Sequence, residues 1–226
     1  MLRVTRVIRI DDDDLHVRIR ESVDNLSTVD RPIAWMQHVS LGFTFREAGA
    51  TRITLRAERS RVFESEGLDS GGLVRGADFD WPCAARPQSD VADLRTFASG
   101  GRSSSFTAHL MDRSSNQGSF AAYSPSAQVF FGYEWERMDF PWLGIWEENK
   151  SRKNQPWNGE TVARGLEFSV SPFPEGRQKT VQWETLLGAT AFRRLGALEQ
   201  PSVEYSAFIG QAQSFPNEAV AAVHRR

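Results

Sequence analysis

The chain has 226 residues, a formal net charge of −2, and 40% hydrophobic and 25% charged residues, which is the composition of an ordinary globular protein. This length allows one sizeable core, so we expect a single domain over residues 1–226. The small net charge argues against nucleic acid or an anionic membrane surface as a partner. No apolar run is long enough to span a bilayer, which argues against a membrane protein.

Cysteine and tryptophan usage give two further indications. Cys83 is the single cysteine, so the fold cannot rely on an intrachain disulfide. The first residues alternate charged and apolar side chains and resemble no signal peptide, so we predict a cytoplasmic location. Seven tryptophans are many for this length. Each could pack in the core, or could offer a flat apolar surface to a sugar ring.

Alternation of apolar and polar residues begins at the N-terminus. Residues 4–10 and 15–23 read as two antiparallel strands, joined by a turn at the four aspartates 11–14. A strand that starts so abruptly suggests pairing with a partner, which makes a homo-oligomer possible.

The rest of the chain continues in short strand-like runs separated by Gly, Pro, Ser and Asp clusters, a pattern typical of a sandwich or barrel. Expected strands cover 52–57, 105–110, 120–123, 128–135, 142–147, 166–170, 180–187 and 204–209, and short helices are expected at 89–97 and 218–224. Residues 147–159 read as a polar loop long enough to border a binding site.

Familiar catalytic motifs are absent. The sequence has no Gly-rich phosphate loop, no paired-cysteine zinc site and no Gly-x-Ser-x-Gly elbow. Its four histidines lie far apart, so we expect no metal site. His38 stands among apolar and aromatic residues ahead of Gly42, and its imidazole could transfer protons near neutral pH. The alternative is a structural histidine bonded to a backbone carbonyl.

Glu167 is the second candidate. It lies within a run of strong strand formers, so its carboxylate either faces solvent or is buried deliberately. Burial would raise its pKa and make it a usable base. The local sequence does not separate these two possibilities.

Three segments, in this order, resemble the aldose 1-epimerases, or galactose mutarotases. The segments are Asn25-Leu26 followed by Arg31-Pro32-Ile33-Ala34-Trp35-Met36-Gln37-His38, Gly165-Leu166-Glu167 followed by Pro172-Phe173-Pro174, and Leu187-Gly188-Ala189 followed by Glu204-Tyr205-Ser206-Ala207-Phe208. The resemblance implies an all-β fold, the galactose mutarotase-like antiparallel β-supersandwich, with the sugar in an open cleft. Only 37 residues precede His38, fewer than in that family, so we expect a version that is truncated or minimal at the N-terminus.

The resemblance also implies an activity and roles for six residues. His38 matches the general acid and Glu167 the general base of sugar ring opening, an isomerase reaction that interconverts anomers without a cofactor or metal. Asp93, Trp142, Trp146 and Gln37 are the expected contacts of a sugar or sugar derivative. The spacing of Trp142 and Trp146 would place both on one face of a strand.

Other functions remain open at this stage. A non-catalytic carbohydrate-binding or regulatory protein could use the same scaffold. A lyase or glycoside hydrolase would need catalytic carboxylates paired across a cleft, and Glu167 has no obvious partner in the sequence. A cupin-like metal protein would need His38 to converge with other ligands.

Overall fold

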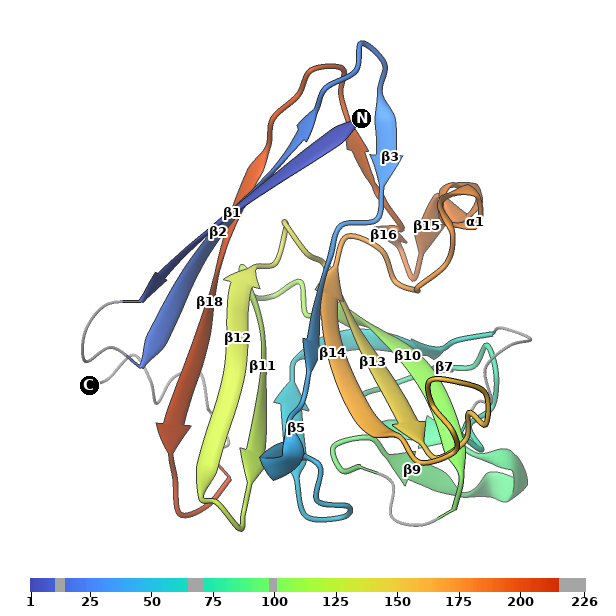
Figure 1. Cartoon of the computed structure of the whole chain (residues 1–226). Helices are drawn as coiled ribbons and strands as arrows, with labels where there is room; N and C mark the ends of the chain where they lie inside the picture. Colours follow the sequence, from blue (N-terminus) through green and yellow to red (C-terminus); the bar gives the residue numbers. More distant parts are fainter. Residues whose placement is uncertain (11–14, 65–70, 98–100, 216–226) are drawn as a thin grey trace.

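The protein is built on two six-stranded sheets. The computed structural model describes residues 1–10, 15–64, 71–97 and 101–215. All pairs of neighbouring strands within the two sheets are antiparallel, and Figure 1 shows β1, β2, β18 and β12 on one side of the molecule and β14, β13 and β10 on the other. This arrangement is the all-β, antiparallel fold expected from the sequence.

Each sheet combines strands from distant parts of the chain. The first has the order β1 (Leu2–Ile10), β2 (His16–Asn25), β18 (Ser202–Gln211), β12 (Val129–Glu136), β11 (Gln117–Ser124), β5 (Arg52–Leu55). The second has the order β4 (Met36–Ser40), β14 (Val162–Ser169), β13 (Trp142–Asn149), β10 (Ser103–Met111), β6 (Ala57–Val62), β7 (Asp78–Phe79).

Short elements complete the fold. Three small two-stranded sheets pair β3 (Arg31–Ile33) with β17 (Arg193–Leu195), β8 (Cys83–Ala85) with β9 (Val91–Asp93), and β15 (Thr185–Leu186) with β16 (Ala189–Thr190). The described helices are the 3-10 turns η1 (Phe43–Phe45) and η2 (Pro87–Ser89) and the α-helix α1 (Arg177–Trp183).

The main core lies between the two sheets. Ile53 of the first sheet and Leu166 and Phe168 of the second are fully buried in it, together with Phe140 from the connection before β13. Trp135 stacks on Phe168 with ring centroids 4.4 Å apart. Every second residue of the strands that line this core therefore points inward, as the alternating sequence runs predict.

A second apolar cluster covers part of the opposite face of the second sheet. Phe106 and Trp142 on this face pack against Phe173, Leu186 and Trp183 from the segment that carries α1 and β15. This segment buries one part of that face, while the part formed by β4 and its neighbours stays more open.

Most of the expected strands are confirmed. The structure has strands at all of the predicted runs except most of 180–187, and β1 and β2 form the predicted antiparallel pair. The run 52–57 is divided between β5 and β6, which belong to different sheets. β1 forms an edge with exposed apolar side chains such as Val4 and Ile10, and its pairing with a partner stays a prediction.

Two local predictions are wrong. Residues 180–187 begin in helix α1, because Gly176 starts a turn followed by helix-favouring Arg177 and Lys179, and only Thr185–Leu186 is a strand. Residues 89–97 contain β9 instead of a helix. There Asp90 accepts a hydrogen bond from the Val91 amide and Asp93 one from the Arg95 amide, contacts that compete with helix formation. The aspartate turn 11–14 and the helix expected at 218–224 lie outside the described residues.

A buried ion pair joins neighbouring strands inside the core. Arg164 on β14 is 1% exposed, and its Nε lies 2.9 Å from Oε1 of Glu147 on β13. The Arg164 guanidinium also donates to the Leu94 carbonyl, which ties the β8–β9 hairpin to the second sheet. Removing one partner would leave the other charge buried and unpaired.

We predict that Arg164→Met lowers the free energy of unfolding by about 3–5 kcal/mol, because Glu147 then loses its counter-ion. Adding Glu147→Leu should recover much of this loss, since both buried charges are then gone. Urea titrations of the three proteins measure both effects. A double variant as unstable as Arg164→Met would show that the ion pair is not the cause.

Candidate active site

Strand pairing brings His38 and Glu167 together. They are direct partners in the register of β4 with β14. Leu166 and Phe168, the neighbours of Glu167, point into the core, so Glu167 points to the opposite face. His38 lies on that same outer face, because cross-strand partners share a face.

The two side chains form a hydrogen-bonded ion pair. His38 Nδ1 lies 2.7 Å from Glu167 Oε1, and the side chains are 40% and 6% exposed respectively. The hydrogen bond to Glu167 raises the pKa of His38; burial opposes this shift and the charge of Glu167 adds to it. The second oxygen, Glu167 Oε2, is buried without a hydrogen-bond partner among the described residues. The pair thus combines an imidazole whose protonated form is favoured by its partner with unused acceptor capacity on the carboxylate.

A glycine makes room for the rings beside this pair. Gly165 on β14 faces Trp146 on β13, whose ring centroid lies 6.0 Å from that of His38. A Cβ at position 165 would lie only 3.1 Å from His38 Cε1 and 3.4 Å from Trp146 Cε3. The absence of a side chain at Gly165 therefore lets the His38 and Trp146 rings approach each other over the strand.

The polar loop after β13 contributes two further side chains. Trp157 packs against Trp146 in an edge-on contact with centroids 5.7 Å apart. The guanidinium of Arg152 lies over both rings, 5.7 Å from the Trp146 centroid and 5.0 Å from that of Trp157. The sequence predicted a polar loop at residues 147–159 that could border a binding site, but it did not single out Gly165, Arg152 or Trp157. The signal for Arg152 and Trp157 was an arginine and a tryptophan within that polar loop.

Trp142 and Trp146 lie on one face of β13, as their spacing predicts, but in different surroundings. Trp146 is partly exposed beside His38. Trp142 is fully buried in the second apolar cluster, and its Nε1 donates to the Thr190 carbonyl at 2.8 Å. Of the two, Trp146 is the one in contact with the His38–Glu167 pair.

The structure does not bring the Gln37 side chain to this pair. Gln37 is buried on the inner face of β4, where its Nε2 donates to Glu21 Oε1 at 2.7 Å and its Oε1 accepts from the Tyr205 hydroxyl at 3.0 Å. Arg6 also donates to Gln37 and to Glu21. These bonds join both sheets across the inner face and fix the strand that carries His38.

Asp93 also lies apart from His38. It ends β9 and binds the guanidinium of Arg95, with Oδ2 2.7 Å from Nη2. This contact with Arg95 lowers the pKa of Asp93. Among the described residues, no recorded hydrogen bond or ion pair links Asp93 to His38 or Glu167.

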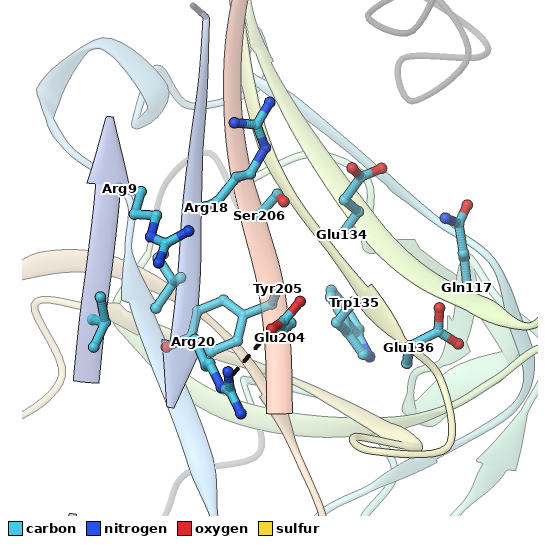
Figure 2. A pocket seen from close by; sticks show the side chains of 12 residues that line it. Arg9, Arg18, Arg20, Gln117, Glu134, Trp135, Glu136, Glu204, Tyr205 and Ser206 are labelled. Atoms are coloured by element: carbon cyan, nitrogen blue, oxygen red, sulfur yellow. Dashed lines mark ion pairs between the residues drawn. The ribbon is translucent and has the colours of Figure 1, made fainter. Parts of the chain in front are cut away.

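A charged cavity of about 590 Å³ lies on the other sheet and contains none of these residues. Figure 2 shows Arg9, Arg18 and Arg20 on one side of it and Glu134 and Glu136 on the other. Arg20 and Glu204 form an ion pair at 3.9 Å, with side chains 65% and 76% exposed. Exposed pairs of this kind are screened and weak, and no histidine is among the residues that line this cavity.

The described histidines do not converge on a metal. His109 is fully buried between Ser60 and Thr107, with its Nδ1 2.8 Å from Ser60 Oγ, and burial lowers the pKa of His109 to about 3. Within the described residues there is no group of three His, Cys, Asp or Glu side chains that could hold a metal ion. His224 lies outside them.

Comparison with solved structures identifies the fold. A proposed aldose 1-epimerase from Klebsiella pneumoniae subsp. pneumoniae MGH 78578 superposes with a TM-score of 0.69 at 12% identity, over 99% of this chain and 49% of that one. A proposed aldose 1-epimerase from Escherichia coli K12 superposes with a TM-score of 0.60 at 16% identity, over 93% of this chain and 60% of that one. A galactose mutarotase-like protein from Clostridium acetobutylicum superposes with a TM-score of 0.54 at 14% identity, over 93% of this chain and 62% of that one. This chain has the galactose mutarotase-like fold.

The likeness is one of structure. No protein-family model and no curated protein matches the sequence. The chain spans about half the length of the Klebsiella structure that it matches. No helix in the described parts of the chain is long and apolar enough to cross a membrane.

We predict that the titration of His38 depends on Glu167. Because the folded-state pKa of His38 is raised above its ordinary value of 6.5, its contribution to stability is complete below that value and is lost as the pH rises through the raised one. Glu167→Gln should lower the His38 titration midpoint, observed by NMR of the imidazole carbon-bound protons. His16 on the first sheet serves as the internal control. An unchanged His38 midpoint would contradict the ion pair.

Proposed function

We propose that this protein interconverts the α and β anomers of an aldose or aldose derivative, as an aldose 1-epimerase-like isomerase. The observation that carries the proposal is the contact between His38 Nδ1 and Glu167 Oε1, 2.7 Å apart on a partly open face of the second sheet. The galactose mutarotase-like fold supports a carbohydrate as the ligand.

In the proposed reaction Glu167 takes the proton of the anomeric hydroxyl and His38 gives a proton to the ring oxygen. The bond between C1 and the ring oxygen breaks, and the electron pair of the anomeric oxygen forms the aldehyde. After rotation about C1–C2, the ring oxygen attacks the other face of the aldehyde and both protons return. Both steps are proton transfers, so no cofactor is required.

The protonation states favour this division of roles. The hydrogen bond to Glu167 raises the pKa of His38, so the imidazole stays protonated further into the neutral range and can act as the acid. His38 Nε2 has no recorded partner among the described residues, and the ring is partly exposed. Oε1 of Glu167 lies against His38 and Oε2 is buried without a partner, so proton abstraction requires the carboxylate to turn toward the open face beside His38.

Sugar contacts by Trp146, Trp142, Gln37 and Asp93 stay predictions, as does the cytoplasmic location. Trp146 has the best position for such a contact, because its ring is partly exposed next to His38. The placement of Gln37 on the inner face gives it a positioning role through β4.

We predict that His38→Asn and Glu167→Gln each slow anomer exchange by roughly 10²–10⁴-fold, the contribution of a positioned acid or base. Polarimetry on freshly dissolved α-glucose and α-galactose measures the rate. His16→Asn and Glu204→Gln, which make the same chemical changes on the first sheet, are the matched controls and should keep the wild-type rate. Wild-type rates in His38→Asn and Glu167→Gln would remove both residues from the mechanism.

A non-catalytic carbohydrate-binding or regulatory role is the second candidate. It would use the same fold and the partly exposed ring of Trp146 without proton transfer by His38 and Glu167. In that case the wild-type protein would bind sugar, detected by a change in tryptophan fluorescence, without accelerating anomer exchange.

A further inference from the structure

Arg152 packs on Trp146, the ring that neighbours His38, and pairs with a buried carboxylate. Its carboxylate partner is Glu148 at the end of β13, which is completely buried. Glu148 Oε1 accepts hydrogen bonds from the backbone amides of Ser151 and Arg152 at 2.7 and 3.0 Å, and Oε2 lies 3.3 Å from Arg152 Nε. Glu148 therefore fixes both the start of the loop and the inner part of the guanidinium.

The position of Arg152 determines which surface of Trp146 and Trp157 a ligand can reach. Exposed tryptophan faces near a sugar site suggest stacking on a sugar ring. Here the Arg152 guanidinium lies over both Trp146 and Trp157, so it occupies a face of each ring. The group that this part of the site presents to a ligand is therefore a cation.

The outer part of the guanidinium remains available. The Arg152 side chain is 32% exposed, and Nη1 and Nη2 donate no hydrogen bond to any of the described residues. A planar guanidinium held by packing loses little freedom when it binds a carboxylate or phosphate through two parallel hydrogen bonds.

We propose that the ligand is an aldose that carries an anionic substituent, a carboxylate or a phosphate, and that Arg152 binds this group through Nη1 and Nη2. The proposal rests on the proposed function for the reacting end of the sugar. Trp146 connects the two ends, since its ring lies 6.0 Å from the His38 ring and 5.7 Å from the Arg152 guanidinium carbon.

Calorimetric titration of the full chain with glucose, glucose 6-phosphate, glucuronate and inorganic phosphate tests this. Charge-assisted hydrogen bonds should make at least one anionic sugar bind about 10-fold or more tighter than glucose. Comparison of glucose 6-phosphate with glucuronate shows whether the anion is a phosphate or a carboxylate. Inorganic phosphate that binds as tightly as the anionic sugars would show that the sugar is not recognised, which overturns the proposal.

Single substitutions test whether Arg152 causes the tighter binding of anionic sugars. Arg152→Gln should remove most of the advantage of the anionic sugar, and Arg152→Lys should retain part of it, because the charge stays and the two-pronged geometry is lost. Lys153→Gln, the same change of charge on the same loop, is the matched control and should keep the preference. Equal affinities of the wild-type protein for glucose and both anionic sugars, or an undiminished preference in Arg152→Gln, would overturn the proposal.

Separate measurements of binding and of anomer exchange distinguish a failure of the anion site from a failure of the isomerase function. Exchange NMR measures the anomer interconversion rates of the same sugars. A preference for anionic sugars that depends on Arg152, without any accelerated anomer exchange, would retain the anion site and remove the isomerase function. Accelerated exchange of glucose without that preference would do the reverse.

Discussion

The strict alternation of side chains along β4 and β14 is the constraint on which the candidate site depends. Leu166 and Phe168 are fully buried in the core, so Glu167 between them must point to the other face. A slip of one residue would drive the Glu167 carboxylate into the apolar core and expose Phe168. The burial that stabilises the sheet therefore also fixes the register that places His38 opposite Glu167.

The buried glutamates show why Glu167 stands out. Glu21 accepts hydrogen bonds from Arg6, Trp35 and Gln37. Glu147 and Glu148 lie against Arg164 and Arg152, with charged atoms 2.9 and 3.3 Å apart.

Among the four glutamates that are buried in the described parts of the chain, only Glu167 has a buried oxygen with neither a hydrogen bond nor an ion-pair partner. Structural carboxylates are normally satisfied, so an unsatisfied one beside a partly exposed histidine makes Glu167 the candidate among these four.

The amino-acid pattern was informative about strands and less so about their partners. Alternating runs such as β2 and β12 were recognisable, because one face of each strand meets the core. Pairing between β4 and β14 could not be read in this way, since the residues lie far apart in the chain and alternation carries no information about neighbours. The family resemblance singled out His38 and Glu167, but only the register explains their contact.

The local errors have physical causes. Alternation in 180–187 suits a strand, but the turn at Gly176 and the helix-favouring residues after it start α1 first. The position of Gln37 away from the pair follows from the alternation of side chains, because a residue adjacent to His38 on a strand faces the other side of the sheet. Arg152 could not be singled out from other loop cations, since its role comes from the tertiary contacts with Trp146, Trp157 and Glu148.

The candidate site is assembled within a single sheet. His38, Glu167 and Trp146 lie on three consecutive strands of one sheet, and Arg152 follows the last of them directly. Their relative positions are set by backbone hydrogen bonds within that sheet and by the core behind it. The contact between His38 and Glu167 therefore depends on this sheet and on the core behind it, and on no other part of the fold.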